Sequence, residues 1–212
     1  LALTSLLALS VQPMVTFFMG QSRFALESMA VLPVIHGLTF IFRAIGLSYL
    51  EVGIALIGDR REHFVRIRNF AVMLAIASTA GLAIIAYTPL SVIWFQTLSG
   101  LTLKLTTFAV WPTRILAIFP ALAVALHTQR AVLVHARRTR PTTWAAMLEV
   151  AVVAAVLTVG IHRLDLIGAV AAAVAILTGR IFGTLCLLPP CLDVLRARPV
   201  LATADTTPVT AD

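Results

Sequence analysis

Six long apolar runs, separated by short polar segments, constrain this chain more than any other feature. They extend from Leu1 to Met19, Ala25 to Ile57, Phe70 to Thr88, Leu103 to Leu126, Thr142 to Ile161 and Leu164 to Leu188. Each run is long enough for a helix that crosses the hydrocarbon core of a bilayer, which takes about 20 apolar residues. The sequence therefore predicts an all-α, polytopic membrane protein with about six transmembrane helices in residues 1–190.

The composition excludes an ordinary water-soluble domain. Hydrophobic residues make up 60% of the chain and charged residues 12%, whereas soluble domains carry roughly 25% charged residues. In a soluble protein the net charge of +7 would suggest a surface for nucleic acid. Here the basic residues gather between apolar runs, so we expect the lipid bilayer as a partner and no nucleic acid.

Basic residues occur mainly in every second segment between the runs. The segments after the second, fourth and sixth runs hold Arg60, Arg61, Arg66, Arg68, Arg130, Arg137, Arg138, Arg140, Arg196 and Arg198. The alternate segments hold only Arg23, Lys104 and Arg163. Because basic residues near span ends stay on the cytoplasmic side, we expect both termini in the cytoplasm and the chain in the plasma membrane, which is the inner membrane of a bacterium.

Residues 191–212 are expected to form a cytoplasmic tail. The end of this segment, Pro199 to Asp212, is rich in Thr, Ala and Pro. Such a composition cannot bury a core and predicts disorder.

Ionisable side chains inside a span are costly unless they meet a partner, water or a ligand, so each is a candidate for function. At about 1.5 Å of rise per residue, Arg114 and His36 lie near the middle of their spans. Arg43 follows His36 by seven residues, or two helical turns, so the two share one helix face. We expect Arg43 and His36 to line one wall of a cavity.

Three further polar residues complete the candidate substrate-binding set. Glu149 lies inside the fifth span, where it either serves a site or forms a structural ion pair with an arginine of a neighbouring helix. Arg180 lies in the sixth span, where its long side chain can also reach toward the interface. Gln12 precedes Pro13, which can break the first span and free a carbonyl group for a substrate.

Proline and glycine positions predict how the spans bend and pack. Pro33, Pro112 and Pro120 interrupt regular helix, which transporters use at sites and hinges but which also occurs as simple kinking. Gly179 and Gly183 form a GxxxG pair, a pattern typical of close contact between membrane helices.

No motif of a catalytic or metal site is present. The sequence has no GxxxxGK[ST] phosphate loop, no HExxH helix and no GxSxG elbow, which removes the common signatures of ATPases, zinc proteases and serine hydrolases. Cys186 and Cys191 have no second Cys or His pair to complete a metal site. We therefore expect neither an enzyme nor a bound cofactor or metal; a transferase that uses His36 has no positive support.

Three stretches resemble the C-terminal bundle of the MOP superfamily, which includes multidrug and toxin exporters and lipid-linked flippases. They are Ala25 to Leu32, which opens the second span, Pro112 to Ile115 with Phe119 and Pro120 in the fourth, and Gly168 to Val170 in the last. Within the superfamily the chain is most similar to the progressive-ankylosis (ANK) type.

The resemblance implies two six-helix bundles that face each other across a central cavity and work by alternating access. This chain would be the second, C-terminal bundle of a MATE-like carrier, and its partner would be a missing N-terminal bundle. A start at Leu1 without methionine fits such a fragment. ANK-type relatives export organic or inorganic anions, so Arg114, at the matching Pro-x-Arg-Ile position, would be an anion contact.

We therefore expect part of a secondary exporter of anionic small molecules. A net positive cavity suits phosphate and carboxylate groups better than cationic drugs. One alternative is a flippase for lipid-linked oligosaccharide or polysaccharide precursors, whose pyrophosphate meets the same charges. Another is a non-transporting membrane scaffold, in which the buried charges only pair between helices.

Overall fold

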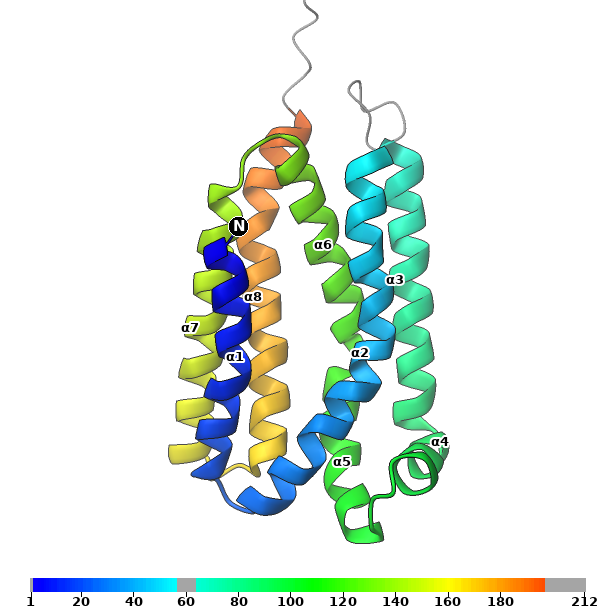
Figure 1. The fold of residues 1–212 in the computed structure, drawn as a ribbon, viewed down its shortest axis with the longest axis vertical. Coiled ribbons are helices and arrows are strands. Elements are labelled where there is room, and N and C mark those ends of the chain that lie inside the picture. The colour runs from blue at the N-terminus through cyan, green and yellow to red at the C-terminus, as the bar shows by residue number, and fades with distance from the viewer. Residues whose placement is uncertain (1, 57–63, 197–212) are drawn as a thin grey trace, which may run out of the picture.

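The computed structural model describes residues 2–56 and 64–196, and this part of the chain consists of helices joined by short turns, with no strand (Figure 1). The helices are α1 (Ala2–Gly20), α2 (Ala25–Leu56), α3 (Phe64–Tyr87), α4 (Leu90–Val92), the π-helix η1 (Ile93–Leu98), α5 (Leu103–Ile115), the 3-10 turn η2 (Leu116–Ile118), α6 (Phe119–His135), α7 (Arg140–His162) and α8 (Gly168–Arg196). The predicted all-α class is confirmed. Helices suit an apolar chain because every backbone group finds its partner within the same segment.

Five of the described helices are long and apolar enough to cross a membrane. These are Ala25–Ile45, Arg68–Tyr87, Leu103–His135, Arg140–His162 and Gly168–Arg196. In α1 the apolar stretch Leu9–Gly20 is shorter than a span. The helices are thus compatible with a multi-pass membrane protein, while the sixth span, the kind of membrane and the side of each terminus stay predictions.

The fourth apolar run extends further than the sequence predicts. It forms α5, η2 and α6 in succession and ends at His135 instead of Leu126. The helix continues past His127 and Arg130 because apolar residues resume after them, and Ala131 and Leu133 are buried in the bundle.

The last helix also passes its predicted end. Residues 191–196, assigned to the tail by the sequence, belong to α8, where Cys191 and Val194 are buried against α6 and α3. Burial of these two apolar side chains explains the extension. The segment Pro199 to Asp212 lies outside the described residues.

A break in regular helix divides the fourth span, as its prolines predict. Pro120 has no N–H group to donate to the carbonyl of Leu116. The N–H of Phe119 donates to that carbonyl instead, which tightens the chain into the 3-10 turn η2. A second proline, Pro33, lies within α2, which bends along its course (Figure 1).

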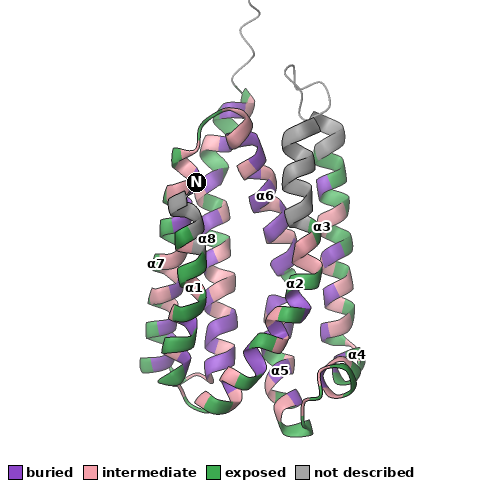
Figure 2. Ribbon diagram, in the orientation of Figure 1, coloured by how far each residue is buried: buried purple, intermediate pink, exposed green. Residues whose placement is uncertain are grey.

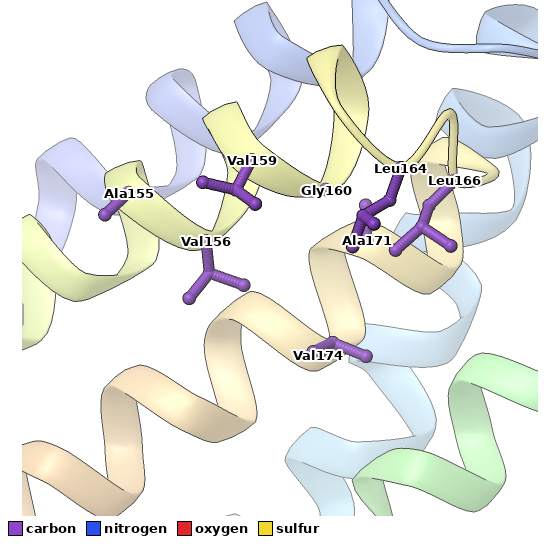
Figure 3. A pocket seen from close by; sticks show the side chains of 8 residues that line it. All are labelled: Ala155, Val156, Val159, Gly160, Leu164, Leu166, Ala171 and Val174. Carbon is purple, nitrogen blue, oxygen red and sulfur yellow. The ribbon is translucent and has the colours of Figure 1, made fainter.

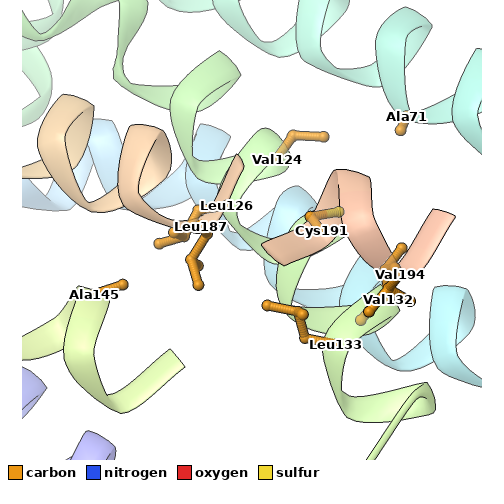
Figure 4. Close-up of a cluster of buried hydrophobic side chains, with 10 residues drawn as sticks. Ala71, Val124, Leu126, Val132, Leu133, Ala145, Leu187, Cys191 and Val194 are labelled. Atoms are coloured by element: carbon orange, nitrogen blue, oxygen red, sulfur yellow. The ribbon is translucent and has the colours of Figure 1, made fainter. Parts of the chain in front are cut away.

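The helices form two groups that are bridged where α6 slants across to the end of α8 (Figure 1). One group contains α1, α7 and α8; the other contains α3, α5, α6 and most of α2. Residues facing the interior are buried and those on the outer faces are exposed (Figure 2). A cluster of buried apolar side chains joins α8 to α6 and includes Val124, Leu133, Leu187 and Cys191 (Figure 4).

Helices α7 and α8 pack closely through the predicted glycine pair. A Cβ atom at Gly179 would lie 3.0 Å from the carbonyl oxygen of Glu149, and one at Gly183 would lie 3.2 Å from its carboxylate Oε2. Both glycines are buried. The interpretation of this GxxxG pair as a helix-packing motif is therefore confirmed, and the pair also fixes where the Glu149 side chain lies.

Replacing Gly179 with alanine is expected to destabilise the bundle by about 1–3 kcal/mol, because the added methyl group would lie 2.5 Å from Cγ2 of the β-branched Val153 and 3.0 Å from the backbone oxygen of Glu149. Thermal unfolding can be followed through the reactivity of the buried Cys191 thiol. Gly37→Ala is the matched control, since a Cβ atom there meets nothing within 4 Å. Equal melting temperatures for the two variants would contradict the role of Gly179.

The two ends of the bundle differ in how their charges are paired. At one end Arg23 forms an ion pair with Asp165 at 3.5 Å, and Lys104 one with Glu27 at 3.1 Å. At the other end the turn between α6 and α7 and the end of α8 carry Arg137, Arg138, Arg140 and Arg196 (Figure 1). None of these four has a carboxylate partner within the described ranges.

Candidate anion-binding cavity

A cavity of about 660 Å³ lies between the two groups of helices. Its walls come from α1, α2, η2, α6, α7 and α8. The polar and charged side chains among its lining residues are Gln12, His36, Thr39, Arg43, His127, Arg130, Glu149 and Arg180. Five of the six residues that the sequence singles out for substrate binding thus line one cavity.

Glu149 and Arg180 form an ion pair across the α7–α8 contact. Arg180 Nη2 lies 3.1 Å from Glu149 Oε1, and each side chain is 15% exposed. The prediction that Glu149 pairs with an arginine of a neighbouring helix is confirmed. Arg180 does not reach toward an interface, because this carboxylate holds it in the cavity wall.

Gln12 and His36 join α1 to α2 on another side of the cavity. The amide Nε2 of Gln12 lies 2.7 Å from Nδ1 of His36. This hydrogen bond links α1 to α2 and leaves further hydrogen-bonding groups of both side chains at the cavity.

Arg43 shares the cavity with His36, as their seven-residue spacing predicts. Its guanidinium lies 5.3 Å from the ring centre of Phe40 and 6.0 Å from that of Phe119. The guanidinium of Arg180 lies 5.1 Å from the same Phe119 ring. The Phe119 ring therefore contacts two guanidinium groups. Each cation is attracted to the π face of the ring, but the two cations repel each other.

Two cavity residues, His127 and Arg130, are not among the six candidates that the sequence indicates. Both follow the predicted end of the fourth span at Leu126, where membrane topology accounts for them. In the structure α6 continues past them, and both line the cavity. Their spacing of three residues, which places two side chains on one helix face, was the available signal.

The lining carries a surplus of positive charge that the cavity itself does not neutralise. Arg43, Arg130 and Arg180 contribute three positive charges and Glu149 one negative charge, which leaves a formal charge of +2. Arg43 and Arg130 have no ion-pair partner in residues 2–56 and 64–196. The buried Nε atom of each also lacks a hydrogen-bond partner there. Buried donors of this kind are costly unless an anion or water satisfies them.

Arg114, the sixth candidate, lies outside the cavity. Its Nε donates to the carbonyl oxygen of Ala86 at 3.2 Å, between α3 and α5. Leu116, which does line the cavity, follows Arg114 by two residues and so points to the opposite side of the helix at 3.6 residues per turn. The structure therefore does not bring Arg114 together with the other five residues.

A second, smaller cavity of about 270 Å³ lies between α7 and α8 near the turn that joins them (Figure 3). Its lining residues are Ala155, Val156, Val159, Gly160, Leu164, Leu166, Ala171 and Val174. All of these are apolar, so no side chain there can orient a polar ligand. The charged cavity is the better candidate site.

Comparison of the chain with protein-family models, curated proteins and solved structures gives no match. The resemblance to the MOP superfamily and its ANK type therefore stays a prediction. The case for a function rests on the cavity and its charges.

Proposed function

We propose that the chain is a helix bundle of a secondary membrane transporter, which binds anionic small molecules in the charged cavity and exports them by alternating access. The observation that carries this proposal is the pair of half-buried arginines, Arg43 and Arg130, which line the cavity and form no ion pair with a carboxylate of the described residues. A cation held partly away from water without an ion-pair partner is a costly feature, and binding of an anion offsets that cost.

A non-transporting scaffold is less well supported. In a scaffold each buried arginine needs a carboxylate partner, and the helices leave no open space between them. Here Arg180 alone of the three cavity arginines has such a partner in the described chain, and the space between the helices is about 660 Å³. Cavities of roughly 300–1,000 Å³ are typical of small-molecule sites.

The lining also indicates what else the ligand carries besides charge. Phe40 and Phe119 contribute rings, and Leu9, Val150 and Ile176 contribute aliphatic surface. A phosphate or dicarboxylate group matches the charge of +2, and a flat apolar body matches the rest. Phenyl phosphate combines both features and serves as a probe.

The proposal is tested first by binding. The purified full chain in lipid nanodiscs should bind phenyl phosphate, measured by calorimetry, and should not bind phenylethylammonium, which has a similar ring and the opposite charge. Equal affinity for the two compounds would refute an anion site. Efflux of phenyl phosphate from vesicles that contain the protein then tests transport. Binding without efflux would support the anion-binding site but refute the proposal that the protein exports anions.

Filling the cavity should abolish binding without harming the fold. Gly37 lines the cavity and a Cβ atom there meets nothing within 4 Å, so the side chain of Gly37→Leu projects into the space of the ligand. We expect phenyl phosphate to bind roughly 5- to 150-fold more weakly, because steric overlap costs about 1–3 kcal/mol. The measurement is calorimetry on protein of unchanged melting temperature.

Gly20→Leu is the matched control for this variant. Gly20 also has open space around its Cβ position, but it is exposed at the end of α1 and is not among the cavity residues. Its affinity for phenyl phosphate should equal that of the unmodified protein. If Gly37→Leu binds as tightly as Gly20→Leu, the ligand does not occupy this cavity.

A further inference from the structure

Arg114 occupies a second, separate environment that the transport proposal does not use. Its guanidinium lies 5.6 Å from the ring centre of Tyr87 and 5.4 Å from that of Trp111. The hydroxyl of Tyr87 donates to the carbonyl oxygen of Arg114 at 3.2 Å. Two aromatic rings and two hydrogen bonds, this one and that from Nε to Ala86, therefore hold the arginine in place between α3 and α5.

This environment lies on the outer surface of the bundle. Trp111 is 64% exposed and Tyr87 61%, and the neighbouring Ile84 and Ile118 are more than half exposed. An apolar outer face of this kind suits contact with lipid. A cation on such a face is costly without a partner, and Arg114 forms no ion pair with a carboxylate of the described chain.

The position along the bundle is that of a membrane interface. Tyr87 is the last residue of α3, and the chain then turns into α4 and η1 before α5 begins. Tyr and Trp side chains are enriched where a membrane helix meets the headgroups. The guanidinium of Arg114 packs on the ring of Tyr87 at this helix end. It therefore lies nearer the headgroups than the mid-span depth that counting along the sequence predicts.

The hydrogen-bond donors of the Arg114 guanidinium are arranged in a way that suits a phosphate group. Its Nε is used by the carbonyl of Ala86, while the two Nη groups donate to no described residue. A planar guanidinium with free Nη groups binds a phosphate through two parallel hydrogen bonds. The flanking rings hold the guanidinium in one orientation, and their apolar faces suit the glycerol and upper acyl chain of a lipid.

We propose that Arg114, Tyr87 and Trp111 form a binding site for the phosphate of an anionic membrane lipid. The site belongs to the outer surface between α3 and α5 and not to the cavity. A free phosphate ester shares the chemistry of the headgroup, but the exposed aromatic and isoleucine side chains favour a ligand that carries acyl chains.

The test uses Trp111 as a reporter in the full chain. Trp94 and Trp144 are replaced with phenylalanine, and the protein is placed in phosphatidylcholine vesicles with a small fraction of phosphatidylglycerol. Bromine atoms on the acyl chains, which quench tryptophan, are carried in one sample by phosphatidylglycerol and in the other by the same fraction of phosphatidylcholine. We expect about fivefold enrichment of phosphatidylglycerol at Trp111, the order that one basic residue provides near anionic lipid.

Arg114→Gln should reduce this enrichment to the bulk composition. Arg163→Gln, which removes a positive charge from an exposed residue at the same end of the bundle (Figure 1), should keep it. Equal quenching by both brominated lipids would overturn the proposal. Absence of quenching by either lipid would also overturn it, because another protein surface would then cover the site. Loss of the enrichment on addition of glycerol phosphate would overturn it too, because the site would then bind a soluble phosphate ester.

Discussion

Arg43→Gln should weaken the binding of phenyl phosphate by roughly 10- to 100-fold, because a hydrogen bond to a charged group contributes about 1.5–3 kcal/mol. Arg43 lines the cavity, and its buried Nε has no hydrogen-bond partner among the described residues. Arg43 forms no ion pair among the described residues, whereas Arg180 already has one of its Nη groups engaged by Glu149. Calorimetry with the full chain in nanodiscs measures the loss.

Two further variants make this result specific. Arg43→Lys keeps the charge but loses the planar fork, so its affinity should fall between those of the unmodified protein and Arg43→Gln. Arg163→Gln removes a positive charge from an exposed residue that does not line the cavity, and this variant should bind phenyl phosphate normally. Unchanged affinity in Arg43→Gln would mean that the anion does not contact this arginine.

Glu149→Gln should destabilise the protein strongly and at the same time tighten anion binding. Removal of one partner of a buried ion pair costs about 3–5 kcal/mol, and an amide recovers part of that through one hydrogen bond. The formal charge of the lining rises from +2 to +3, so Arg180 becomes available to the ligand. The melting temperature should fall without ligand and recover with saturating phenyl phosphate, which stabilises by about 2.7 kcal/mol at 100 times its dissociation constant.

The double variant Glu149→Gln with Arg180→Gln separates the two effects. It removes both charges of the pair, so the melting temperature should return most of the way to that of the unmodified protein. Its affinity for phenyl phosphate should resemble that of the unmodified protein, since the formal charge of the lining is again +2. A melting temperature as low as that of Glu149→Gln would show that the pair does not account for the loss of stability.

The spacing of polar residues along a single helix predicts which of them line the cavity together. His36 and Arg43 lie two turns apart and share the wall that their spacing requires. Glu149 finds its arginine because close packing at Gly179 and Gly183 brings α7 against α8. In these cases short-range periodicity and a packing motif carry the information, and both can be read from the sequence.

The assignment of Arg114 fails for a different reason. The direction of a side chain around a helix depends on which face packs against the neighbouring helices, and the sequence of one span does not show this; Arg114 packs on Tyr87 of α3 and not toward the cavity. His127 and Arg130 were missed because hydropathy ends the span at Leu126, whereas packing of Ala131 and Leu133 extends α6. The break at η2 was foreseeable, since Pro120 lacks a backbone donor.

The unequal pairing of charges at the two ends gives the bundle an electrical polarity. Arg23 and Lys104 are neutralised by Asp165 and Glu27 at one end, while Arg137, Arg138, Arg140 and Arg196 at the other have no carboxylate partner in the described chain. In the proposed orientation, a membrane potential that is negative inside attracts the end of the bundle with the unpaired arginines toward the cytoplasm. Each uncompensated charge carried across the membrane would cost about 2.3 kcal/mol per 100 mV, so the potential itself would oppose inversion of the bundle.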